Sequence, residues 1–550
     1  MHRFRPKLLD TLHGYSRKQF GQDVAAGITV GVLALPLAMA FAIASGMSPA
    51  AGIWTGIVGG LLISLLGGSR VQIGGPTGAF IPIVYGVVAA HGVDNMLVAT
   101  MLAGALLLAM GLARLGNLVR MIPIGVVIGF TNGIAVVIFL SQVRDFLGLR
   151  LQGELPAEFF ARMQALGAAL HTTHWPTLAL GLGAVLCIVG WERLAKRWPL
   201  LARCPSQLAA LVLGTVLCVA LNLPVETIEA RFGGIPQGVP MPGLPAFSIT
   251  TLGSLLSPAL AIALLGAIES LLSARVADAS IDDRHDPNQE LVGQGIANLA
   301  APLFGGFAAT GAIARTATNI RAGARTPVAG IVHALLLLLI VVVAAPLAGY
   351  VPIPVLAAIV VVTAVRMGEW HEFARLKHFS WNYRAVVLSA FVFTVLFDLT
   401  IAVEIGMILA CLFFIYRMQD LTSVDMKPAV DIPGGVPAGV QLVALRGSLF
   451  FGAIARLDAQ LDPARIQGRV LVLDLREVLN IDTSGVDWLS ALRRGLARRG
   501  IGLVLCAAGR QVGSLLQRSG FVTQLGADRV LPDLSAALAR AREDIDDTST

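Results

Sequence analysis

Residues 74–79 read Gly-Gly-Pro-Thr-Gly-Ala, and residues 305–312 read Gly-Gly-Phe-Ala-Ala-Thr-Gly-Ala; each stretch opens an apolar run. Glycine and proline interrupt helices, so both runs are predicted to be half-helices that begin inside a membrane. They open the third and the tenth predicted spans. Because seven spans, an odd number, separate these two starts, the second copy is expected to lie inverted in the bilayer. Such paired, interrupted segments indicate a transporter binding site at an inverted-repeat interface. Close helix packing, which also uses glycine pairs, is the alternative interpretation.

The composition is that of a membrane protein. Of the 550 residues, 56% are hydrophobic and 14% are charged, and the mean hydropathy is +0.76. Soluble proteins carry about 25% charged residues, so a soluble enzyme is excluded as the whole answer. The net charge of +7 indicates cationic cytoplasmic loops, and we expect no nucleic-acid partner. The five cysteines are odd in number and lack metal-ligand spacing, so no disulfide framework or zinc site is expected. No cofactor is expected either.

Fourteen apolar runs are candidate membrane spans, several of them shorter than the ~20 residues that a full crossing needs. The run that follows the basic N-terminus is too long for a signal peptide, so the first span is expected to be retained. The runs occupy approximately residues 22–45, 50–67, 74–91, 95–114, 121–143, 174–192, 205–222, 257–275, 291–306, 309–320, 327–347, 352–366, 384–398 and 400–416.

Alternate loops differ in charge, and this difference predicts the orientation. One set carries most of the basic residues, whereas the opposite set holds a few arginines that are accompanied by acids. The positive-inside rule then places both termini in the cytoplasm of a cell-membrane protein, as an even number of spans also requires. The basic set comprises the N-terminal cluster, Arg70, Arg114, Arg120, Arg193, Lys196, Arg197, Arg203, Arg275, Arg284, Arg321, Arg325, Arg366, Arg375 and Lys377.

The composition changes after Arg417. A polar linker at 419–437 is predicted to separate a transmembrane transport domain (1–418) from a soluble domain (438–550). Strands that alternate with helices in this last part predict a small α/β domain with a largely parallel sheet. The strands are expected at Val440–Arg446, Val470–Leu475 and Gly502–Ala507, and the helices at Trp488–Arg499, Gln511–Gly520 and Leu534–Glu543.

The two half-helix starts are predicted to form an anion site. Unsatisfied N–H groups and positive dipole ends would converge there. Thr77 adds a hydroxyl to the first half-helix, although it could instead be a helix N-cap. Arg315 lies one turn into the second half-helix, and its alternative is to extend to the cytoplasmic surface.

Glu269 stands within an apolar stretch, and no other acid is expected deep in an apolar run before Asp398. A carboxylate inside a membrane is costly and by default functional, because burial disfavours its ionised form. We therefore predict proton coupling at Glu269. A structural pair between Glu269 and Arg315 is the alternative.

A possible regulatory residue lies in the soluble domain. Residues 480–485 follow a strand and open a helix, where Asp482 or Thr483 suits the N-cap. Ser484 is expected to be exposed at this helix start, where a phosphate would be stabilised. A plain cap is the alternative. No Walker A or G-x-G-x-x-G pattern occurs, so nucleotide hydrolysis is not supported.

The Gly-rich breaks, the apolar runs and the C-terminal α/β part, taken in their order along the chain, resemble the sulfate permease (SulP) family of anion transporters over nearly the whole chain. The C-terminal part resembles the STAS domain, with its Asp-x-Ser-Gly turn at Asp482–Gly485. The most specific stretches elsewhere are Asp23–Gly27 with Pro36, Gln72–Gly78, Gln294–Asn298 and Ala309–Arg321.

The resemblance implies two inverted seven-helix repeats, in which a core domain moves against a gate domain, and commonly a homodimer. Sodium-coupled bicarbonate members are similar but have an Asp at the position of Glu269 and a hydroxyl at that of Ile313. Because Ile313 cannot ligate a cation, this difference favours protons over sodium. The resemblance places the anion at Thr77, Gly78, Ala79, Ala312, Ile313, Ala314 and Arg315.

The predicted function is secondary active, proton-coupled transport of small inorganic oxyanions by elevator-type alternating access, with no enzymatic activity. A sulfate-like anion is the default because a helix-dipole and arginine site suits a compact divalent anion. The alternatives are a bicarbonate or C4-dicarboxylate transporter, an exchanger, a channel, a nucleobase permease or an anion-sensing membrane protein. Expected partners are the anion, protons, the lipid bilayer, a second copy and cytoplasmic regulators bound through the STAS domain.

Overall fold

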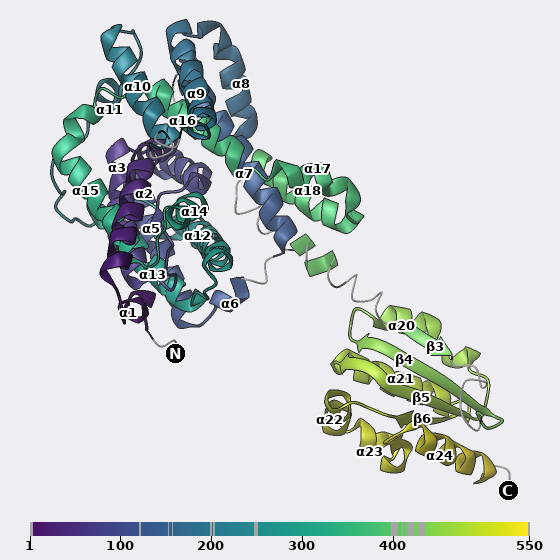
Figure 1. The fold of residues 1–550 in the computed structure, drawn as a ribbon. Helices are drawn as coiled ribbons and strands as arrows, with labels where there is room; N and C mark the ends of the chain where they lie inside the picture. The colour runs from purple at the N-terminus through teal and green to yellow at the C-terminus, as the bar shows by residue number, and fades with distance from the viewer. Residues whose placement is uncertain are drawn as a thin grey trace. The chain divides into compact units, whose positions relative to one another are not determined.

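A computed structural model describes most of the chain, which divides into two compact units, Met1–Met407 and Ile408–Thr550 (Figure 1). Each unit is described by itself. The expected Asp398 and most of the predicted linker lie outside the described residues. The described residues are 4–119, 123–151, 153, 155–156, 158–198, 201, 204–246, 251–397, 405–406, 408–409, 411–413, 415, 423–426 and 435–547.

The first unit is helical. Among the described residues, eight helical segments are long and apolar enough to cross a membrane, and two shorter apolar helices accompany them. The eight are Arg17–Ala44 (α2), Pro49–Leu66 (α3 Pro49–Trp54, a π-helical turn and α4 Gly60–Leu66), Gly78–Leu112 (α5 Ile81–Leu112 with its first turn), Ile124–Leu147 (α7), Trp175–Ala195 (α9), Leu252–Ile281 (α12), Val328–Ala348 (α15) and Ile353–His378 (α16 Ile353–Met367 with α17 Trp370–Arg375). The shorter two are α10 (Ser206–Ala220) and α18 (Trp381–Leu396).

Several helices of this unit are interrupted or short. The predicted spans 74–91 and 95–114 form one element, α5, which breaks at Gly92, where φ is +83°. The predicted spans 291–306 and 309–320 become α13 (Pro287–Ala300) and α14 (Ile313–Arg321), which a 3-10 turn (Ala301–Phe304) and a short strand (Thr310–Gly311) separate. Short helices complete the unit: α1 (Lys7–Thr11), α6 (Gly116–Val119), α8 (Phe159–Ala169) and α11 (Ile228–Phe232).

The helices pack in two groups. The first group comprises α2, α3, α4, α5, α12, α13, α14 and α15, and the second comprises α7, α9, α10, α16 and α18. The groups meet where α16 and α10 pack against α2, and where α7 contacts α2, α5 and the turn Gly78–Phe80. Small residues permit the closest packing within a group. A Cβ on Gly104 of α5 would lie 2.8 Å from the carbonyl oxygen of Gly295 on α13, and one on Gly129 of α7 would overlap the backbone of α18.

Asp23 explains one of the motifs noted above. Its buried carboxylate accepts hydrogen bonds from the Tyr15 hydroxyl (2.8 Å), the Arg325 N–H (2.7 Å) and both the N–H (3.1 Å) and hydroxyl (2.6 Å) of Thr326. This residue therefore fastens α2 to the segment that precedes α15. Burial and the bond to Asp23 raise the pKa of Tyr15 to about 12, so this hydroxyl remains a donor at physiological pH.

The second unit is an α/β domain with a five-stranded sheet in the order β3-β4-β5-β6-β7. Strand β3 (Ser423–Met426) is antiparallel to β4 (Val440–Leu449), and β4, β5 (Val470–Ile481), β6 (Gly502–Cys506) and β7 (Val530–Leu531) are parallel. The three predicted strands are confirmed. Strands β3 and β7 were missed, because two to four residues give no readable alternation.

Helices cover both faces of this sheet. Alternate residues of β4 and β5 point to opposite sides. On one side Leu442, Val470 and Val472 pack against Ala537 and Ala541 of α24 (Leu534–Asp547). On the other side lie α20 (Ile454–Gln460), α21 (Thr483–Ala497), α22 (Arg510–Arg518) and α23 (Phe521–Leu525). All three predicted helices are present.

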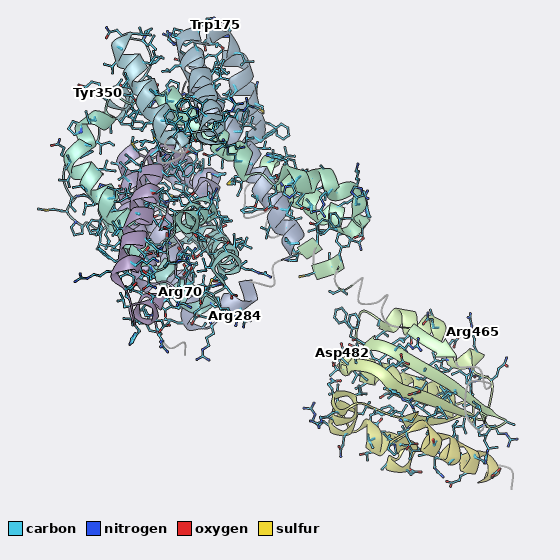
Figure 2. All side chains as sticks on the ribbon, in the orientation of Figure 1. Arg70, Trp175, Arg284, Tyr350, Arg465 and Asp482 are labelled. Carbon is cyan, nitrogen blue, oxygen red and sulfur yellow. The ribbon has the colours of Figure 1, made fainter. Side chains whose placement is uncertain are left out.

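Asp482, labelled in Figure 2, caps α21. Its carboxylate accepts hydrogen bonds from the N–H of Gly485 (2.9 Å) and the N–H of Phe451 (3.1 Å), so it joins the helix start to the end of β4. Asp482 rather than Thr483 is therefore the N-cap. Ser484 is half-buried, not exposed as expected, because the helix start sits against Leu449, close to Gly485.

We expect Asp482→Ala to loosen α21 without unfolding the domain. Losing an N-cap costs about 1–2 kcal/mol, which corresponds to an opening equilibrium about 5- to 30-fold more favourable. Hydrogen–deuterium exchange of the peptide that covers 483–497, followed by mass spectrometry of the full-length protein, measures this change. Thr483→Ala is the matched control, since Thr483 is exposed and does not cap. Equal exchange in the two variants would contradict the assignment.

Candidate functional site

The two Gly-rich breaks lie side by side. Strand β1 (Gly74–Gly75) pairs antiparallel with β2 (Thr310–Gly311), in a register that sets Gly74 opposite Gly311 and Gly75 opposite Thr310. A helix begins directly after each strand: the 3-10 turn Gly78–Phe80 leads into α5, and α14 begins at Ile313. Because the first N–H groups of a helix have no intrahelical partner, donors and positive dipole ends from both helices converge here.

Further hydrogen bonds, from both backbone and side chains, extend this pairing. The N–H of Ala312 donates to the carbonyl oxygen of Ile73 (3.0 Å), and the N–H of Ile73 donates to the Thr316 hydroxyl (3.1 Å). The Thr310 hydroxyl donates to the carbonyl oxygen of Gly266 on α12 (3.0 Å). Three elements far apart in the chain are thereby fixed around one point.

The glycines of the two strands leave no space for a side chain. A Cβ on Gly311 would overlap the side chain of Gln72, and a Cβ on Gly74 would overlap Ile63. Gly75 has a φ of +145°, which side chains rarely adopt, and a Cβ there would overlap the guanidinium of Arg315. Glycine is therefore required at these positions for the backbones to approach.

Thr77 links the first half-helix to α12. It occupies the N-cap position, but its side chain makes no capping bond. Instead its hydroxyl donates to Oε2 of Glu269 (2.9 Å). The capping interpretation is therefore wrong for the Thr77 side chain.

Arg315 is buried behind the paired strands, with 3% of its surface exposed. Its guanidinium donates to the carbonyl oxygens of Pro76 and Gly74, the latter at 3.5 Å. It does not extend to a surface, so the alternative of a surface arginine is wrong. Within the described part of the chain no ion pair joins Arg315 to Glu269 either. The guanidinium charge of Arg315 instead lies against Gly74 and Pro76, in the segment that leads into the first half-helix.

The two half-helix starts differ in accessibility. Gly78 and Ala79 are buried, and so is Ala312. By contrast, Ile313 is 41% exposed and Ala314 is also exposed. A ligand can therefore reach the N-terminal turn of α14, where backbone N–H groups, the helix dipole and the nearby guanidinium all favour negative charge.

Glu269 is half-buried, whereas a fully buried carboxylate, Glu290, lies close by on α13. Glu290 accepts hydrogen bonds from the N–H of Gly68 (2.9 Å), the hydroxyl of Ser270 (3.1 Å) and the amide of Gln294 (2.9 Å). The amide of Gln72 donates to the same Ser270 hydroxyl (3.1 Å). Ser270 adjoins Glu269, so this polar layer supports the helix that carries the candidate coupling residue.

Asp23 and Glu290 are both buried, although neither lies deep in a predicted apolar run: Asp23 stands at the start of one and Glu290 just before another. Glu290 was missed because the polar residues Asn288 and Gln289 precede it, and the segment resembles a loop. The signal that could have found it is the Pro287–Glu290 sequence immediately before an apolar run, since Pro at the first helical position marks a helix start.

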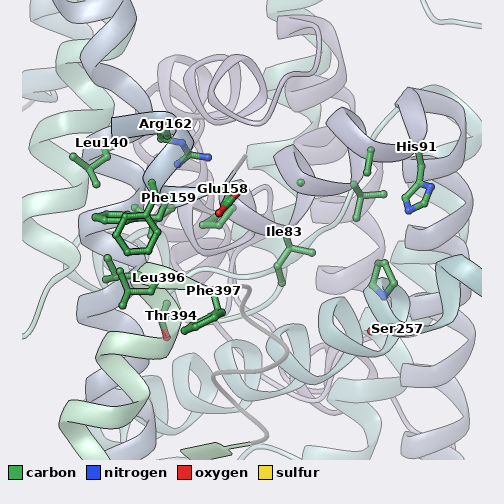
Figure 3. Close-up of a pocket in the computed structure, with 18 residues that line it drawn as sticks. Ile83, His91, Leu140, Glu158, Phe159, Arg162, Ser257, Thr394, Leu396 and Phe397 are labelled. Carbon is green, nitrogen blue, oxygen red and sulfur yellow. The ribbon is translucent and has the colours of Figure 1, made fainter. Parts of the chain in front are cut away.

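A cavity of about 630 Å³ lies beside α5, and Ile83 is among the residues that line it (Figure 3). Segments of α5, α7, α8, α12 and α18 line it, and its polar residues include His91, Glu158 and Arg162. Burial lowers the pKa of the Arg162 guanidinium. Neither Thr77, Glu269 nor Arg315 lines this cavity, so it is separate from the half-helix starts.

We expect Gly311→Ala to disrupt the site. The new methyl group would displace Gln72 from Ser270 and leave buried polar groups unpaired, at a cost of about 1–3 kcal/mol each. The thermal midpoint of the purified protein should fall by a few degrees, and stabilisation by added anion should be lost. Gly183→Ala, on α9 with nothing within 4 Å of its Cβ, is the control. Retained anion-dependent stabilisation in Gly311→Ala would contradict the need for glycine.

Comparison with known proteins gives a consistent result. A sequence model of the sulfate permease family matches residues 20–390, and one of the STAS domain matches residues 428–537. The chain is 40% identical over 517 residues to the "Putative sulfate transporter YvdB" of Bacillus subtilis, covering 93% of this chain and 96% of that protein. It is 31% identical over 542 residues to the bicarbonate transporter BicA of Picosynechococcus, with 94% of each chain covered.

Solved structures share the fold. SLC26A9 superposes with a TM-score of 0.88 at 18% identity, covering 98% of this chain and 93% of that chain. The transmembrane domain of a cyanobacterial BicA superposes with a TM-score of 0.64 at 34% identity, covering 71% of this chain and 98% of that chain. The first of these likenesses concerns the fold alone.

Proposed function

The chain belongs to the sulfate permease family and carries a C-terminal STAS domain, and on that premise we propose that it is a proton-coupled transporter of small inorganic oxyanions. Members of this family are membrane transporters of anions and not enzymes. The observation that carries the proposal is the meeting of two helix starts over one buried arginine. A sulfate-like anion is the default, because a compact divalent anion gains most from such a concentration of positive potential.

We assign the anion to the backbone N–H groups at the two helix starts. Gly78 and Ala79 offer donors on one side, and Ile313 and Ala314 offer donors on the other. Ala312 and Arg315 flank them. Because Arg315 already donates to Gly74 and Pro76, its contribution is the charge rather than a direct contact.

Glu269 is the proposed proton carrier. Its hydrogen bond with Thr77 brings the carboxylate to the first residue before the half-helix. A protonated Glu269 offsets one unit of the negative charge that must cross with the anion. Sodium is a poorer candidate, because the side chain of Ile313 has no atom that could ligate a cation.

Elevator-type movement is supported by the packing of the helices. All residues of the proposed site belong to the first helix group, and the turn Gly78–Phe80 also contacts α7 of the second group, so the site lies at the boundary between them. The site would therefore move with the first group as the core, while the second group acts as the gate. We further propose that the two interrupted half-helices belong to inverted repeats and that the protein forms a homodimer.

We also propose an orientation, which the charges at the two ends of the first unit support. In Figure 2, Arg70 and Arg284 lie at the end opposite Trp175 and Tyr350. By the positive-inside rule, the arginine end would face the cytoplasmic side of the cell membrane, together with both termini and the STAS domain. That domain would regulate transport, with Ser484 as a half-buried candidate for modification.

We expect Glu269→Gln to abolish anion accumulation driven by a proton gradient. The amide resembles the protonated acid permanently, so no proton can be released. Uptake into liposomes by the unmodified protein should rise as the external pH falls, because protonation of Glu269 is required for net movement. The variant should retain exchange of internal for external anion, which needs no net proton transfer. Accumulation by the variant with an unchanged pH profile would contradict the assignment.

We expect Arg315→Ala to weaken anion affinity by about tenfold or more, because charge-assisted electrostatics in a buried site exceed about 1.4 kcal/mol. Isothermal titration of the purified protein measures the affinity. Arg321→Ala is the matched control, since Arg321 is exposed on the same helix. An unchanged affinity with lower protein yield would indicate that Arg315 only supports the fold.

The main alternative functions differ in the anion that is transported and in the transport mechanism. Similarity to BicA makes bicarbonate a second candidate, with C4-dicarboxylates third. A panel of labelled sulfate, bicarbonate and fumarate in proteoliposomes separates these substrates. Uphill uptake under an inward proton gradient indicates a symporter, obligatory counterflow an exchanger, passive flux a channel, and binding without flux a sensor.

A further inference from the structure

A second cavity, of about 680 Å³, lies where the two helix groups meet. Its walls come from α2, α3 and α15 of the first group and from α10 of the second. Apart from the hydroxyls of Thr215 and Tyr350, every side chain that lines it is apolar. With no charged residue in its walls, this cavity is unsuited to an anion, a cation or a polar solute.

The cavity is continuous with the surface that faces the bilayer. Val212 and Val216 of α10 and Leu347 of α15 line the cavity and are also exposed. In a membrane protein such exposed aliphatic side chains contact lipid. The opening of the cavity is therefore part of the lipid-facing surface.

The interior of the cavity is suited to hydrocarbon. Met39 of α2 and Ile53 of α3 form its deep wall, and each is only 1% exposed. An unfilled space of this size would deprive its walls of dispersion contacts, and water would find too few polar partners there. Helix α10 is also short: its 15 residues span about 22 Å, less than the ~30 Å hydrocarbon core, so lipid must adapt around it.

Tyr350 indicates from which side of the membrane an occupant would enter the cavity. It lines the cavity, is exposed and lies just beyond the end of α15 (Figure 2). Tyrosine favours the membrane–water interface, where its ring contacts hydrocarbon and its hydroxyl contacts polar groups. In the orientation proposed above, this interface belongs to the outer leaflet.

We propose that this cavity binds one acyl chain of an outer-leaflet phospholipid, which enters between α10 and α15 and reaches Met39 and Ile53. The chain fills the space between the two helix groups and opposes their approach. The binding itself does not depend on what the protein transports. Only an effect on transport rate rests on the proposed function.

The test is photolabelling of the full-length protein in vesicles of phosphatidylethanolamine and phosphatidylglycerol. A trace of phosphatidylcholine with a diazirine in its acyl chain is activated by light, and adducts are located by mass spectrometry. We expect adducts at Met39 or Ile53 as well as at Val343, a residue of α15 that is 69% exposed and outside the cavity. Since Met39 and Ile53 are otherwise buried, their labelling requires a chain inside the cavity.

Two variants of neighbouring residues provide the control. Ala344→Phe places a ring in the cavity and should reduce labelling of Met39 and Ile53 by about tenfold, whereas Val343→Phe should leave it unchanged. Labelling of Val343 alone would overturn the proposal. So would labelling of Met39 or Ile53 by a water-soluble diazirine, which would indicate an aqueous cavity. Protection of Val212 and Val216 from the lipid probe would indicate instead that a second copy covers the opening. None of these readouts requires transport, so failure here is distinguishable from failure of the proposed function.

Discussion

The antiparallel pairing of Gly74–Gly75 with Thr310–Gly311 is the interaction on which the rest of the first unit depends. A helix that begins inside a membrane leaves backbone groups that neither water nor lipid can satisfy. Here the two breaks pair with each other, and the hydroxyl of Thr316 accepts from the N–H of Ile73. The side chains of Gln72 and Thr310 donate to carbonyl oxygens of α12 and so hold that helix against the breaks. The same pairing leaves the N–H groups of the following helix turns without intrahelical partners, which makes them available to a ligand.

Buried charge in this unit is held mainly by backbone groups and small polar side chains rather than by opposite charges. Asp23 accepts from two backbone N–H groups, Glu290 accepts from one, and Arg315 donates to two carbonyl oxygens. An ion pair between Arg315 and Glu269 would have neutralised the site and weakened its attraction for an anion. The arginine instead donates to uncharged carbonyl groups, which leave its positive charge uncancelled by any direct ion pair among the described residues.

Much of the fold could be predicted because hydrophobicity is a strong signal over long segments. The apolar runs, the change of composition after Arg417 and the Gly-rich breaks each depend on many neighbouring residues. The site was less predictable where a single side chain had several possible partners. Sequence placed Thr77 and Arg315 near the half-helix starts, but only the three-dimensional arrangement assigns the Thr77 hydroxyl to Glu269 and the Arg315 guanidinium to backbone carbonyls. Likewise the depth of Glu290 depends on Gly68 and Ser270, residues that no local pattern connects with it.

The bond between Thr77 and Glu269 suggests how proton and anion could be coupled in the proposed mechanism. A hydroxyl has one proton to donate, and an ionised carboxylate can only accept. While Glu269 is ionised, the Thr77 proton is engaged with it, as in the observed geometry. A protonated Glu269 can donate to the Thr77 oxygen instead, which frees the Thr77 proton to point toward an anion at the half-helix start. Protonation would then both remove a negative charge from the neighbourhood of the anion and supply a further donor to it. Both effects favour the anion in the protonated state, and by reciprocity the bound anion favours protonation of Glu269.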